Sequence, residues 1–196
     1  LFGGNPNLDP EEADSFTLGL VLEPMKNLSI TMDAFQIEVN DVISSVPATT
    51  TLSKCLDTGD ANFCSLVHRD SIGSLWATPA GFIEANNQNL ASRKTSGVDL
   101  GVNYGYKLAG LGNLGFSLMG TYLHEFKSTD LPGEAAYDCK GLYGPTCGTP
   151  LPEWRHKARV TWTTPWSMDL ALTWRHLDSV ALDRSSPDAM LTRNVN

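Results

Sequence analysis

Apolar residues alternate with small or polar residues over long stretches of the chain, and a period of two residues is typical of β-strands. The clearest run is 95–108, in which the apolar residues stand at even positions: Val98, Leu100, Val102, Tyr104, Tyr106 and Leu108. Strands of soluble proteins usually have about 5–6 residues, whereas a tilted strand that crosses a bilayer needs about 9–11. The length of this run therefore favours a membrane-spanning strand.

The same alternation recurs along the rest of the chain and predicts five more strands, at about 15–22, 28–43, 114–126, 153–163 and 168–175. In 28–43 the apolar positions change phase, from the even series that begins at Leu28 to the odd series that begins at Phe35. We expect a bulge near Ala34 there, or a change in the surroundings of the strand.

The connections between the predicted strands are of two kinds. Three are short and rich in Pro, Gly and Asn, at 24–27, 109–113 and 164–167, and three are long and polar, at about 44–79, at 128–152 and from 178 onward. Outer-membrane barrels have short periplasmic turns and long extracellular loops. The alternation of the two kinds is therefore typical of such a barrel, and it predicts that the short connections of this chain are periplasmic and the long ones extracellular.

The placement of tryptophan agrees with a membrane strand. Trp154 and Trp162 are eight residues apart on one face of the same predicted strand. At about 3.3 Å per residue and a tilt of about 40°, this spacing covers about 20 Å along the membrane normal, close to the apolar band between the two aromatic rows of a barrel. A soluble β-sandwich also alternates, but it needs neither such long strands nor aromatic residues at both ends of the apolar face.

Composition narrows the class further. The hydrophobic share of 41% is too high for a disordered chain, and no apolar run approaches the roughly 20 residues of a membrane helix. A net charge of −8 argues against nucleic-acid binding. The chain starts at Leu1 without a signal segment, and six strands are too few to close a barrel, since the smallest have about eight. We therefore expect residues 1–196 to be part of a larger barrel.

Four cysteines indicate an oxidising compartment. The sequence-local pairing, Cys55 with Cys64 and Cys139 with Cys147, would close two short polar loops and stabilise each by roughly 2–3 kcal/mol. Free thiols are an alternative, and a zinc site fits poorly because neither pair has the spacing of a zinc knuckle. Disulfides point to the periplasm, the cell surface or secretion.

Four segments in order resemble the strands of TonB-dependent outer-membrane receptors: GNPNLDPEEADSFTLGL, LSITMDAFQIEVNDVI, NLASRKTSGVDLGVNYGY and LPEWRHKARVTW. The resemblance covers essentially the whole chain. It implies an all-β fold, namely part of a transmembrane antiparallel barrel of about 22 strands, here lacking the N-terminal plug domain and the last strands.

The same resemblance implies a function. Such receptors lie in the bacterial outer membrane and import scarce substrates with energy from the inner-membrane TonB complex, which would be contacted through the missing N-terminal region. The expected partners are therefore the lipid bilayer with its lipopolysaccharide, the TonB complex and a small molecule, with no nucleic acid and no cofactor. The ligand would be a carbohydrate or siderophore-like compound, and cysteine pairs in the loops look like a branch linked to carbohydrate uptake. A passive porin and an outer-membrane lipase are the alternatives.

A ladder of basic residues, Arg155, Lys157 and Arg159, is predicted on the polar, inward side of one strand. It could attract an anionic substrate. It could equally form salt bridges with the plug or with neighbours such as Glu125 and Asp169, because the interiors of wide barrels are polar.

The long loops hold the other candidates for ligand contact, which are Asp57, Asp60, Trp76, Phe82, Tyr137 and Tyr143. The two carboxylates could hold calcium or simply belong to a stapled, turn-rich loop, since the order of an EF-hand is missing. The aromatic side chains could stack on a flat ligand or pack the loops.

Three histidines, His124, His156 and His176, are predicted on the outward side near the loop ends of their strands. They could form a metal cluster or lie at the depth of the lipid headgroups. No nucleophile elbow, zinc-protease motif or phosphate-binding loop is present in the sequence, so we expect no enzyme activity and no metal site.

Overall fold

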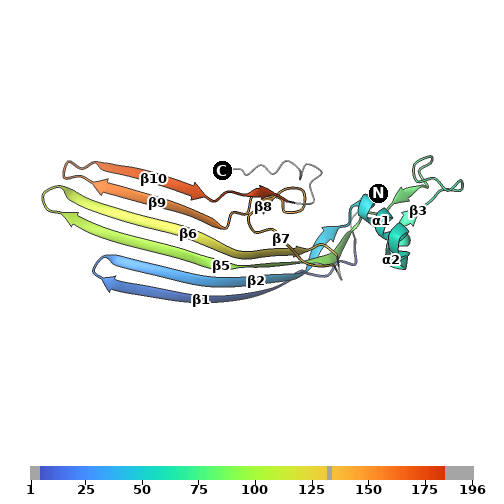
Figure 1. Cartoon of the computed structure of the whole chain (residues 1–196), viewed down its shortest axis with the longest axis horizontal. Coiled ribbons are helices and arrows are strands. Elements are labelled where there is room, and N and C mark those ends of the chain that lie inside the picture. Colours follow the sequence, from blue (N-terminus) through green and yellow to red (C-terminus); the bar gives the residue numbers. More distant parts are fainter. Residues whose placement is uncertain (1–4, 132–133, 184–196) are drawn as a thin grey trace. The chain divides into compact units, whose positions relative to one another are not determined.

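The computed structural model describes residues 5–131 and 134–183 (Figure 1). Contacts divide the chain into two compact units, one made of 1–12, 39–92 and 130–134, and the other of 13–38, 93–129 and 135–196. The elements are, in chain order, β1 (Glu12–Met25), β2 (Leu28–Ser45), α1 (Ala48–Thr58), α2 (Ala61–Cys64), β3 (Val67–His68), β4 (Phe82–Ile83), β5 (Asn87–Leu108), β6 (Gly112–Thr129), β7 (Tyr137–Asp138), β8 (Leu142–Tyr143), β9 (Trp154–Thr163), β10 (Asp169–Leu177) and β11 (Ala181–Leu182).

Six long strands form one antiparallel sheet in the order β1-β2-β5-β6-β9-β10, and β7 pairs with the end of β6. The order in the sheet follows the order in the chain, so each long strand pairs with the next one, as Figure 1 shows. The six predicted strands are confirmed, and several are longer than the alternation indicated: β5 has 22 residues and β2 has 18. The described part of the sheet is not a closed barrel.

The register gives the sheet two distinct faces. Along β6, β9 and β10, odd residues stand opposite odd residues, as in the row Asn113, Thr163 and Asp169. We call the even-numbered side of the long strands in the second unit the apolar face and the odd-numbered side the polar face. Large exposed hydrophobic side chains gather on the apolar face, where they include Phe16, Leu18, Leu20, Leu22, Met32, Tyr106, Phe116, Tyr122, Val160, Leu170, Leu172 and Trp174.

The expected bulge near Ala34 is wrong. A Cβ atom added to Gly101 would meet Thr31, and one added to Gly97 would meet the ring of Phe35, 2.8 Å from its Cζ. From the first pair to the second, the residue of β2 moves forward by four positions and the residue of β5 moves back by four. The antiparallel pairing of β2 with β5 is therefore regular between Thr31 and Phe35. Phe35 lies on the polar face because the missing side chain of Gly97 leaves room for its ring.

The three short turns occur where the sequence predicts them. The turn after β1 uses Asn27, with φ of 63°, and the turn after β5 uses Gly110, with φ of 76°. In the turn after β9, the hydroxyl of Thr164 donates to the carbonyl of Met168 at 2.9 Å and accepts from its amide at 3.2 Å. These bonds keep the strand ends in register.

The first long connection contains two helices, for which the sequence pattern gives no signal. α1 and α2 are joined by the disulfide Cys55–Cys64, and the carboxylate of Asp60 accepts a hydrogen bond from the amide of Asn62 at 2.9 Å to cap α2. Helices shorter than about 12–15 residues are marginal in isolation, so the disulfide and the cap account for their presence here. None of the helices in the described ranges combines the length and the hydropathy needed to span a membrane.

The second long connection is held at two points. The disulfide Cys139–Cys147 closes it, and the fully buried carboxylate of Asp183 accepts hydrogen bonds from the amides of Thr146 and Cys147, both at 3.0 Å. The short strand β8 of this connection pairs in parallel with β11. Both disulfides thus follow the sequence-local pairing.

Candidate ligand-binding face

Two groups of charged residues on the polar face, one acidic and one basic, contribute to the lining of the same hollow. Asp33 and Asp99 stand on β2 and β5, and a basic group stands on β9 and β10: Arg155, Lys157, Arg159 and Arg175. We call these four residues the basic group. All four side chains are exposed, and among the described residues the structure gives none of them an ion pair. Their positive charges are therefore concentrated on two neighbouring strands.

The register brings together residues that the sequence analysis kept apart. Lys157 stands directly opposite Arg175 across β9 and β10. The predicted ladder ended at Arg159 because the alternation of one strand does not show which residue of the next strand lies beside it. The only signal for Arg175 was its place on the odd side of a predicted strand.

The neighbours that could have neutralised the ladder do not do so. The carboxylate of Glu125 pairs with Lys127 at 2.6 Å and with Lys94 at 3.8 Å. Asp169 stands opposite Thr163 at the far end of β9. The prediction that Glu125 and Asp169 bridge to the ladder is therefore wrong. Glu125 is paired with the two lysines, and the residue opposite Asp169 is four positions along β9 from Arg159.

An open hollow of about 520 Å³ is lined by residues of both the acidic and the basic group. Its lining includes Asp33, Asp99, Met119, Thr121, Arg155, Lys157 and Arg175. The hydroxyl of Thr121 donates to the carboxylate of Asp99 at 2.7 Å, which fixes the acidic side. We call this space the charged cavity.

A second, more enclosed cavity of about 240 Å³ adjoins it. Most of its lining is apolar, and it consists of Phe35, Leu123, Phe126, Pro150, Leu151 and Pro152, with Thr95, Thr121 and Arg155. We call this space the apolar cavity. Thr121 and Arg155 line both cavities, so a single guanidinium stands where they meet.

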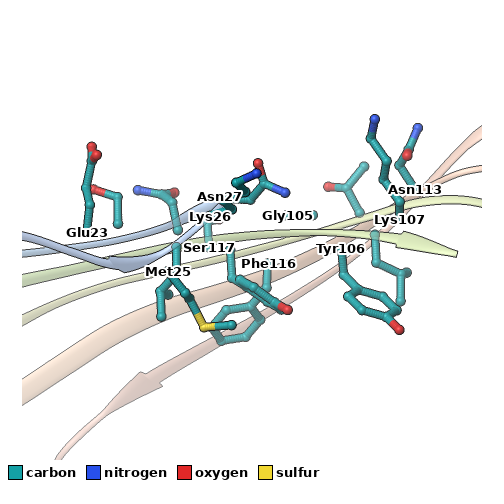
Figure 2. A pocket seen from close by; sticks show the side chains of 17 residues that line it. Glu23, Met25, Lys26, Asn27, Gly105, Tyr106, Lys107, Asn113, Phe116 and Ser117 are labelled. Carbon is teal, nitrogen blue, oxygen red and sulfur yellow. The ribbon is translucent and has the colours of Figure 1, made fainter.

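A third hollow, of about 880 Å³, lies at the end of the sheet with the short turns. Figure 2 shows Glu23, Lys107 and Asn113 on one side of the strands there, and Phe116 and Tyr106 on the other. This hollow is wide and open, and it follows the same division into a polar and an apolar face. It offers no enclosed space for a ligand.

Aromatic side chains form rows at both ends of the apolar face. At one end the indole of Trp154 lies over Gly120 and donates to Nδ1 of His156 at 2.7 Å. At the other end the indole of Trp162 donates to the carbonyl of Leu111 at 2.8 Å and its ring lies 6.4 Å from that of Trp166. Indoles with an apolar body and a bonded N–H are typical of the two interfaces of a membrane.

The three histidines do not form one cluster. His156 stands opposite His176 with ring centroids 5.2 Å apart, and Nε2 of His176 lies 3.0 Å from a carboxylate oxygen of Asp178. Their other ring contacts are with Trp154 and Trp174. Within 5–131 and 134–183 no group of three or more metal-ligating side chains is arranged to hold a metal ion.

The loop candidates belong to different elements of the two units. Asp57 lies in the last turn of α1 and is exposed, while Asp60 caps α2. Phe82 stacks on His68 at 4.5 Å, so it packs the loop. Tyr137 belongs to β7 and Tyr143 to β8.

Trp76 differs from the other loop aromatics because 85% of its surface is exposed. The hydroxyl of Ser74 accepts hydrogen bonds from the amides of Trp76 at 3.2 Å and Ala77 at 3.1 Å. The carboxylate of Asp70 accepts from the amide of Ser74 at 2.8 Å. The turn is therefore ordered by its own polar groups while its indole faces outward.

A sheet of long antiparallel strands with one apolar face, one polar face and aromatic rows at both ends of the apolar face has the construction of a transmembrane β-barrel wall. The family model described as "TonB dependent receptor-like, beta-barrel" matches residues 1–191, and the chain belongs to this family. The family comprises bacterial outer-membrane receptors for energised uptake, which work with TonB and small-molecule ligands, and it is not an enzyme family. No curated protein and no solved structure matches the chain.

Proposed function

We propose that this chain is a stretch of the barrel wall of an energised receptor that imports a scarce small molecule across the outer membrane. The two-faced sheet carries the proposal. Its apolar face would contact lipid, and its polar face would line the interior through which the ligand passes. The carbohydrate or siderophore-like ligand expected from the family resemblance is one that a polar interior can accommodate.

The whole protein would contain more strands and a plug domain. Within residues 5–131 and 134–183, β1 and β10 each have one edge without a partner strand. In lipid, each unsatisfied backbone group costs several kcal/mol, so further strands would pair with both edges. The plug would close the passage and connect the receptor to the TonB complex.

The two long, disulfide-closed connections are the proposed place of ligand capture. The three short turns would face the periplasm, and the two stapled connections would face the outside of the cell. Ordered loops lose less conformational entropy when they bind. Trp76, exposed on a turn that its own hydrogen bonds order, is the loop residue best placed to stack on an arriving ligand.

Uptake by the native bacterium tests the proposal. Three strains would be compared under nutrient limitation: the parent, a strain without the receptor, and a strain without the energy-transducing complex. Mass spectrometry of the spent medium should show at least one compound that only the parent removes. If every compound is removed equally by all three strains, the receptor has no energised uptake function.

Conductance in planar bilayers separates the receptor from a passive porin. A plugged receptor should give no steady channel when the full-length protein is inserted. A steady ohmic conductance in every insertion would contradict the proposal and favour the porin.

A further inference from the structure

We infer that the polar face carries a binding site for a small amphipathic anion, with an aromatic or similarly compact apolar group in the apolar cavity and a carboxylate in the charged cavity. The inference rests on the proposed function and names the chemical class of its substrate. It also uses only residues of the second unit.

The anionic end of the ligand follows from the pairing of like charges. Lys157 and Arg175 are directly opposite in the register, a position in which Cβ atoms are about 4.5–5.5 Å apart and like charges destabilise the sheet. Arg155 lies two residues from Lys157 on the same face. An anion between these side chains would replace the repulsion with charge-assisted hydrogen bonds, and a guanidinium suits a carboxylate because it can donate two parallel bonds.

The apolar end of the ligand follows from the size and lining of the apolar cavity. Phe35, Leu123 and the segment 150–152 enclose about 240 Å³. An apolar cavity of about 150 Å³ is large enough to hold benzene. One aromatic ring with a short substituent would therefore fit, and its burial would be favourable.

The junction of the cavities joins the two ends. Arg155 and Thr121 line both spaces, so a ring in the apolar cavity would place a carboxylate on a short link beside the guanidinium. A neutral sugar would leave the basic group without a counter-ion. An acidic polypeptide segment would be too bulky to use the enclosed cavity.

The acidic side of the charged cavity restricts the ligand further. Asp33 and Asp99 face the basic group across this space. A second carboxylate on the ligand would meet these two negative charges, whereas a hydroxyl group could donate to them. The site therefore favours a monoanion.

Binding to the full-length receptor in detergent tests the inference. Phenylacetate is the probe, phenylacetamide is its neutral counterpart, and acetate is the anion without the ring. Equilibrium dialysis with labelled compounds would give the three affinities. We expect phenylacetate to bind about tenfold or more tightly than either control, because a hydrogen bond to a charged group contributes about 1.5–3 kcal/mol.

Three variants assign the binding to this site. Arg155→Gln should weaken phenylacetate about tenfold or more, and Leu123→Phe, which fills the apolar cavity, should weaken phenylacetate without changing acetate. Lys107→Gln is the matched control, since it removes a positive charge from the same face but outside both cavities, and it should leave the affinity unchanged. Circular dichroism would establish that each variant is folded.

Three results would overturn the inference: no binding of phenylacetate, equal binding of phenylacetate and phenylacetamide, or an unchanged affinity in folded Arg155→Gln. If any of these results occurred but the cells still showed energised uptake that depends on the receptor, only the inferred substrate class would be wrong. If the three strains removed every compound equally, the proposed function would be wrong, whether or not phenylacetate binds.

Discussion

Replacing Val160 with arginine should destabilise the protein because the side chain would face lipid. Val160 is 40% exposed on the apolar face, two residues from Ala158, which is halfway between Trp154 and Trp162 in β9. At about 3.3 Å per residue and a tilt of about 40°, Val160 lies about 5 Å from the middle of the bilayer. Arginine costs about 2–4 kcal/mol at the midplane of a barrel, so we expect a loss of about 2–3 kcal/mol at this depth.

Gly115→Arg is the matched control on the polar face. Gly115 stands opposite Thr161, the next residue along β9 after Val160, so its depth is nearly the same. A Cβ atom at Gly115 would meet nothing closer than the carbonyl oxygen of Thr161 at 3.9 Å, so the new side chain has room. The control should change the free energy of unfolding by less than about 1 kcal/mol.

Guanidinium unfolding of the full-length protein in lipid bilayers, followed by tryptophan fluorescence, would measure both variants. Since Val160 is already partly exposed, little packing is lost, and the difference between the variants reports the lipid contact itself. Equal losses from Val160→Arg and Gly115→Arg would refute the assignment of the two faces.

Three further perturbations test separate parts of the structure. Replacing Cys55 and Cys64 together with serine should destabilise the two helices by roughly 2–3 kcal/mol and raise hydrogen exchange there, while the sheet exchanges as before; protection unchanged in the helices would count against the staple. Asp183→Ala should leave the part-buried amides of Thr146 and Cys147 without this acceptor, cost about 1–3 kcal/mol and speed hydrogen exchange in the loop 139–147. Exchange as slow as in the unchanged protein would contradict this role. Gly120→Val should displace the indole of Trp154, which lies over the glycine, and lower the free energy of unfolding by about 1–3 kcal/mol. The fluorescence of Trp154 should shift, and an unchanged spectrum would argue against the contact.

Much of the fold follows from local pattern. A period of two residues marks both faces of each strand, and Pro, Gly and Asn mark the turns, so the long strands and the short turns could be predicted. The local pattern does not explain why the apolar positions of β2 change from even to odd at Phe35. Phe35 lies on the polar face because Gly97, more than sixty residues away in the chain, leaves space for its ring, and the sequence alone does not show that pairing.

The helices α1 and α2 were missed for a different reason. Both helices are short, and α1 is rich in Thr, which has modest helix propensity. They depend on the disulfide Cys55–Cys64 and on the cap at Asp60. The sequence predicts that pairing but not the conformation of the chain between the two cysteines.

The candidate site was predicted only in part. The alternation placed Arg155, Lys157 and Arg159 on one side of a strand, but the like-charged neighbour Arg175 emerges only from the register of β9 with β10. The apolar cavity depends on the return of 150–152 over the polar face. Such long-range contacts leave no periodic signal in the sequence.

The central claim is that this sheet is one part of the wall of a larger, plugged barrel. The mass and the N-terminal sequence of the intact polypeptide, purified from its native outer membrane, test it most directly. The account predicts a chain several hundred residues longer that opens with a plug domain. A native polypeptide of about 196 residues without such a domain would contradict it.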